Sequence, residues 1–124
     1  MQALPEFKRV VTGHDQQGQA IVASNGPTPN VFPLSSVPGT VFHELWNSST
    51  SPALLDNASD PSSKPLQLSP GPQGSVIRVV DIPPDSVQNQ VSDENAAAVF
   101  TEIGQSHAGT GQGSTRHKLM HRTE

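Results

Sequence analysis

The side chains in this sequence that could do chemistry are, first, its five histidines. His117 and His121 are four residues apart, a spacing that on a helix would direct both imidazoles toward one metal ion. No glutamate or third histidine supports the pair, and the residues before His117 have no helical pattern. An exposed basic tail explains the same residues without any ligand, so a metal pair is the less favoured interpretation.

The other histidines lie in different settings. His14 falls in a polar turn and His107 in a glycine-rich tract, so we expect both to be exposed. His43 lies in the middle of an apolar strand pattern. A half-buried, hydrogen-bonded histidine is the favoured interpretation there, and a place in a ligand pocket is the alternative.

Other reactive patterns are weak. Residues 109–113 contain three glycines, but no strand precedes them and no Lys-Ser or Lys-Thr follows, so they do not predict a phosphate-binding loop. No serine lies in a Gly-x-Ser-x-Gly turn. The chain has no cysteine, which excludes disulfides and thiolate metal sites. Its net charge of −4 gives no field that would attract nucleic acid or an anionic membrane.

The elements that must position these residues are short β-strands. Residues 7–24 predict a β-hairpin around a polar, glycine-bounded connection. Residues 31–34 are extended and apolar, and 41–46 form a strand in which neither face is cleanly polar. Residues 75–82 are the strongest strand, and their run of branched apolar side chains predicts burial on both faces.

One helix is predicted over residues 93–103. Ser92 is a suitable N-cap, and Gly104 is the expected stop. The apolar residues within it recur at the spacing of one helix face, which predicts that this face packs on a core. These residues are Ala96, Val99, Phe100 and Ile103.

Long polar segments separate these elements. Residues 47–74, rich in serine and proline, predict a surface loop with a few apolar anchors, and residues 104–118 predict a flexible tract. Only 32% of the residues are hydrophobic, so the core must be modest. We therefore expect one mainly β domain with one short helix. The sequence shows no signal peptide or membrane span, which favours the cytoplasm. The expected anchors in the long loop are Leu54, Leu55, Leu66 and Leu68.

The order of these segments, more than any single one, resembles the small cupin-domain proteins found beside fungal secondary-metabolite genes. The resemblance is carried by residues 7–15, 18–22, 30–32, 40–46, 74–84 and 119–124. It implies a partial cupin jelly roll (a double-stranded β-helix), with residues 1–124 as the N-terminal portion of a single domain. Residues 119–124 would then open the first cupin motif.

The resemblance also implies where a metal would bind. Metal-binding cupins place two histidines one residue apart and then a glutamate in the first motif, with another histidine in the second. His121 aligns with the first histidine, whereas Thr123 replaces the second, and Thr115 stands where a glycine is expected. Longer relatives would hold Fe, Mn or Zn. With one of four ligands, this chain alone is expected to bind such metals poorly.

A tailoring enzyme of fungal polyketide or other secondary-metabolite biosynthesis is the function that the resemblance implies. An oxidoreductase acting on a small aromatic or polyketide substrate is favoured, with decarboxylase or cyclase-like activity close behind. A non-catalytic small-ligand-binding cupin is the alternative. His121 would be a metal ligand or polar contact at the pocket, and His43 is a second candidate.

The resemblance places most of the barrel and the second motif beyond Glu124. We therefore expect this chain to be inactive by itself. Nucleic acid and membranes are not expected partners. The exposed strand edges of a partial barrel leave homodimerisation open.

Overall fold

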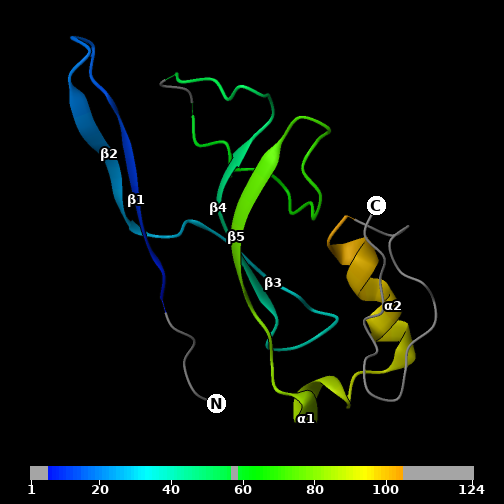
Figure 1. Cartoon of the computed structure of the whole chain (residues 1–124). Helices are drawn as coiled ribbons and strands as arrows, with labels where there is room; N and C mark the ends of the chain where they lie inside the picture. The colour runs from blue at the N-terminus through cyan, green and yellow to red at the C-terminus, as the bar shows by residue number, and fades with distance from the viewer. Residues whose placement is uncertain (1–5, 57–58, 105–124) are drawn as a thin grey trace. The chain divides into compact units, whose positions relative to one another are not determined.

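The computed structural model describes residues 6–56 and 59–104. The protein is mainly β, with five strands in two antiparallel sheets. Strands β1 (Lys8–His14) and β2 (Ala20–Pro27) form one sheet, and β3 (Asn30–Pro33), β4 (Val41–Ser48) and β5 (Ser75–Asp81) form the other in the order β3-β4-β5 (Figure 1). No helix in the described ranges is long and apolar enough to cross a bilayer.

The predicted hairpin is confirmed. Two residues, Asp15 and Gly18, shape the turn between its strands. The carboxylate of Asp15 accepts hydrogen bonds from the backbone N–H groups of Gln17 and Gln19, both at 2.9 Å. Gly18 has a φ of 78°, a left-handed conformation that costs glycine no steric penalty. His14 is exposed as expected, although it ends β1 rather than lying in the turn.

Two compact units divide the chain. The first comprises Met1–Val31, His43–Lys64 and Pro70–Val79, and the second comprises Phe32–Phe42, Pro65–Ser69 and Val80–Glu124.

The second unit contains the apolar core and the predicted helix. Helix α2 (Asp93–Glu102) begins at Ser92, whose hydroxyl accepts a hydrogen bond from the Asn95 N–H at 3.1 Å. Gly104 follows its end with a φ of 74°. The spacing rule was right at every position, because all four predicted apolar residues are buried in the core. They pack with Leu34, Val37, Phe42 and Val91.

A carboxylate at the end of α2 fixes the loop that follows β3. Glu102 accepts hydrogen bonds from the backbone N–H groups of Ser35 and Ser36 at 2.7 and 3.1 Å, and from both serine hydroxyls. Burial alone would raise the pKa of Glu102, but these hydrogen bonds outweigh it and lower the pKa. The loop and the helix are thus joined by polar contacts as well as by the core.

Three expectations about these elements were wrong. Ile77 on β5 is 59% exposed, so this strand is not buried on both faces. Leu54 and Leu55 anchor nothing, because both are exposed, whereas Leu66 and Leu68 do pack against the core. A second helix, α1 (Asp85–Gln88), follows Pro84. A single turn is too short to produce a periodic apolar pattern, and α1 buries no residue.

Candidate functional site: a depression beside Trp46

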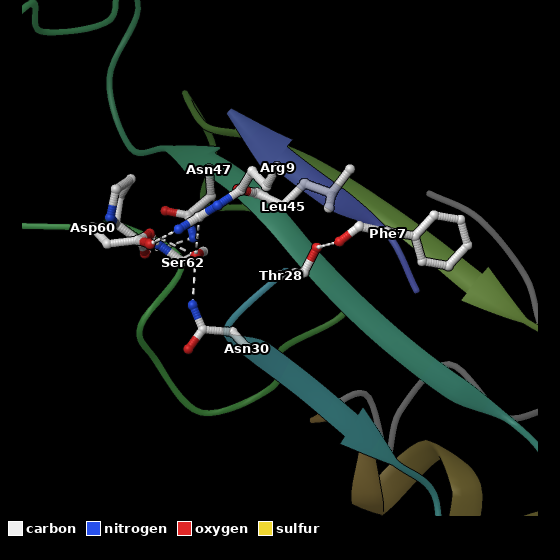
Figure 2. Close-up of polar contacts among 9 residues, drawn as sticks. Phe7, Arg9, Thr28, Asn30, Leu45, Asn47, Asp60 and Ser62 are labelled. Atoms are coloured by element: carbon white, nitrogen blue, oxygen red, sulfur yellow. Dashed lines mark hydrogen bonds and ion pairs between the residues drawn. The ribbon is translucent and has the colours of Figure 1, made fainter. Parts of the chain in front are cut away.

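A polar network in the first unit is centred on the side chain of Ser62, which is 2% exposed (Figure 2). Its hydroxyl donates to the Asp60 carboxylate at 2.6 Å. The same oxygen accepts hydrogen bonds from Asn30 at 2.7 Å and from Arg9 at 3.2 Å. One donor and two acceptor positions are thus all used, which is what a buried hydroxyl requires.

Arg9 links this network to two strands. Its guanidinium extends from β1, donates to the Leu45 carbonyl on β4 at 3.0 Å, and forms an ion pair and hydrogen bond with Asp60. Asn47, two residues further along β4, donates from its amide to the Pro61 carbonyl at 2.7 Å. Figure 2 shows these side chains converging on Asp60 and Ser62. The segment around residues 60–62 is therefore pinned to the strands.

The charge of Asp60 is set by this arrangement. The hydrogen bond from Arg9, together with those from Ser62, lowers the pKa of Asp60 to about 2, against burial, which raises it. Asp60 is therefore ionised across the whole range in which the protein would work, and the ion pair with Arg9 persists.

This shift predicts a loss of stability in acid. A depressed carboxyl pKa stabilises the fold above the unfolded value of 3.8, and this contribution disappears as the pH falls toward about 2. We expect the free energy of unfolding to drop by about 1–2 kcal/mol between pH 4 and pH 2 from this group, after allowing for its partial exposure. Urea unfolding at pH 6, 4, 3 and 2 measures it.

Two variants make the acid test specific. Asp60→Asn should remove this component of the pH dependence, whereas Asp85→Asn, which removes an exposed carboxylate, should keep it. Equal pH profiles for the wild type and Asp60→Asn would contradict a stabilising role for the ionised carboxylate.

Pro61 of the pinned segment lines a depression of about 210 Å³, together with its neighbours Ser59 and Lys64. The end of β4, from Trp46 to Ser48, forms another part of its lining. The loop contributes hydroxyl groups, the apolar side chain of Leu54, and two charged residues, Asp56 and Lys64. The depression thus joins an aromatic ring, apolar surface and polar groups, the mixture that small-molecule sites use.

Neither histidine of the described residues, His14 or His43, lines this depression. His43 is 7% exposed on β4, and the edge of one ring faces the other in its contact with Phe7, at a centroid distance of 4.8 Å. It is more buried than expected, and it does not line the depression beside Trp46. His107, His117 and His121 lie outside the described residues, as do Thr115 and Thr123.

A metal site cannot be built from the part of the chain that the structure describes. Residues 6–56 and 59–104 contain no group of three or more His, Cys, Asp or Glu side chains placed to hold a metal ion. The role of His121 as a metal ligand therefore stays a prediction.

The spacing of the histidines does not identify the residues that line the depression. Two signals pointed to it: Trp46 is the only tryptophan in the chain, and Lys64 is the only basic residue between positions 47 and 74. A large aromatic residue at a strand end, followed by a polar loop with one cation, is a pattern that can mark a ligand site.

Comparison with known proteins adds no family. No protein-family model matches the chain, and a search of curated proteins found no matching sequence. The resemblance to cupins therefore remains a hypothesis.

Proposed function

We propose that this chain is part of a cupin-type protein that binds a small aromatic or polyketide molecule, and that the depression beside Trp46 contacts that molecule. The mainly β architecture is compatible with the lead-in strands of a cupin jelly roll. The observation that carries the proposal is the pinned depression itself. Residues 60–62 lie in a loop without regular structure and are held by four side-chain contacts, beside a concave surface that includes a partly exposed tryptophan.

The fixed loop is important because binding costs entropy. A segment that must be ordered by its ligand spends part of the interaction energy on that ordering. Residues 60–62, which Arg9, Asn30 and Asn47 already fix, avoid this cost. Placement on such a loop also leaves the site open to solvent, so that a small molecule can enter.

Catalysis is the further part of the proposal. An oxidoreductase of fungal secondary metabolism is the activity that we propose for the longer protein, acting in the cytoplasm, with His121 as its metal ligand or polar contact. Decarboxylation and cyclisation are the neighbouring reactions. The non-catalytic alternative is favoured by one observation, because the described residues that line the depression suit binding and include a single carboxylate, a single ammonium and no histidine. Homodimerisation also remains a prediction.

Because Trp46 is the only tryptophan, ligand binding can be measured directly. We expect some members of a panel of small aromatic and polyketide-type compounds to shift its indole N–H signal in ¹H–¹⁵N spectra to a saturating limit. Ala53→Phe places a large side chain in the depression and should lower the affinity measured from this shift about tenfold or more. Ala23→Phe on the exposed strand β2 should leave the affinity unchanged. No saturable shift with any compound would refute binding at this site.

The same samples separate enzyme from binding protein. Mass spectrometry of a bound compound after incubation with the protein would reveal a changed mass if the chain performs the reaction. An unchanged compound that still binds would support the non-catalytic alternative.

A further inference from the structure

The depression has two chemically different parts, an aromatic one and a cationic one. Trp46 is 39% exposed, so a substantial part of its indole is available to a ligand. Leu54 adds apolar surface, since its side chain is exposed rather than packed elsewhere. A planar apolar ring can lie against such a surface, and offset stacking on an indole adds attraction beyond the buried area.

The two charged residues that line the depression, Asp56 and Lys64, differ in whether their charge already has a partner. Asp56 already has an interaction partner. By contrast, the ammonium of Lys64 makes no hydrogen bond or ion pair with any residue in the described ranges. The site therefore offers one uncommitted positive charge, and this charge favours an anion.

The backbone of Lys64 is fixed even though its side chain is uncommitted. Its N–H donates to the Ser62 carbonyl at 2.8 Å, and Ser62 is the centre of the polar network. Through Ser62, the network therefore fixes the position of the Lys64 backbone, from which the side chain extends. The four methylenes of the side chain keep the ammonium adjustable within reach of the depression.

Size limits the ligand. A volume of about 210 Å³ lies below the ~300–1,000 Å³ of pockets that hold drug-sized molecules. A single aromatic ring with one small substituent is therefore the appropriate scale, or one such end of a larger molecule.

We propose that the depression binds a small planar aromatic anion, an aromatic carboxylate, with its ring against Trp46 and its negative charge toward Lys64. This inference rests on the proposed function and makes it more specific, because it names the charge and the size of the group bound. The hydroxyl of Ser49, which also lines the depression, is an additional donor for the carboxylate oxygens.

The test compares benzoate with benzamide, a neutral molecule of nearly the same shape, through the single indole N–H signal. In the wild type we expect benzoate to bind about five- to tenfold more tightly than benzamide at low salt, because the lysine attracts only the anion. Lys64→Gln should abolish this preference by weakening benzoate binding to about the level of benzamide binding. Lys64→Arg should retain the preference, because the positive charge is preserved.

The control is Lys8→Gln, which removes an exposed cation of the hairpin and should leave the preference intact. Equal binding of benzoate and benzamide by the wild type would overturn the inference and leave the proposed function standing. A preference that survives in Lys64→Gln would also overturn it. Binding of neither compound, nor of any compound in the wider panel, would overturn both.

Discussion

Replacing Arg78 by methionine should lower the free energy of unfolding by about 3–5 kcal/mol, the typical cost of breaking a buried ion pair by removing one partner. Arg78 on β5 faces Glu44 on β4, and their side chains are only 13% and 8% exposed. The guanidinium Nη2 donates to Oε2 of Glu44 at 3.2 Å, and Nε lies 2.9 Å from Oε1. Without the arginine, a buried carboxylate loses its main counter-charge.

The Nε contact is a charge interaction rather than a second well-directed hydrogen bond. Neither Nε of Arg78 nor Oε1 of Glu44 has a hydrogen-bond partner, although the two atoms are close. The pair is therefore not an ideal fork, and its net contribution relative to an apolar pair is small. The free energy lost on removing one partner therefore differs from the net stability that the intact pair provides relative to two apolar residues.

A double variant tests that distinction. Glu44→Leu combined with Arg78→Met removes both charges and should recover most of the stability that Arg78→Met alone loses. Urea or thermal unfolding followed by circular dichroism measures both. Lys8→Met, which removes an exposed cation, should change stability by less than about 0.5 kcal/mol. The single variant Glu44→Leu completes the comparison. A double variant as unstable as the sum of its two single variants would show no coupling between the charges and would contradict this explanation.

The sequence predicted best where structure depends on local contacts. Helix α2 follows from a short stretch of sequence, because its cap, its apolar face and its glycine stop are all encoded within residues 92–104. The hairpin was predictable for the same reason, with Asp15 and Gly18 forming its connection. In both cases periodicity and turn chemistry report directly on backbone geometry.

The candidate site was not predictable because its contacts are distant in sequence. Arg9 meets Asp60 and Ser62 across 51 and 53 residues, and no local pattern records such a pairing. Ser62 looked like any other serine of a polar loop, yet it is among the most buried side chains in the described ranges. Residues 47–64 have the composition of a disordered segment, and it is polar partners rather than apolar burial that hold residues 60–62.

Burial on the faces of the sheet was only partly predictable. A run of branched residues such as that of β5 identifies a strand but does not say which layers cover it. Residues 41–44 on β4 are all buried, as the absence of a polar face predicted, whereas Ile77 on β5 is exposed. The difference depends on neighbours that the strand sequence does not contain.

Replacing Phe100 by alanine should lower the free energy of unfolding by about 3–4 kcal/mol, the second large effect that we expect. Phe100 is 7% exposed in the core of the second unit, where α2 packs with Leu34, Phe42 and Val91. Truncation to alanine loses the free energy gained by burying the ring, and it leaves a cavity that the rigid helix cannot move to fill. Unfolding in urea, with amide hydrogen exchange of α2 as the local readout, measures the loss.

Matched substitutions on the same helix decide whether packing is the cause. Phe100→Leu conserves most of the volume and should cost less than about 1.5 kcal/mol. Thr101→Ala, at an exposed position one residue further on, should change stability by less than about 0.5 kcal/mol. If Phe100→Ala cost no more than Thr101→Ala, α2 would not be held by its apolar face. The four hydrogen bonds that Glu102 accepts from Ser35 and Ser36 would then be its main attachment.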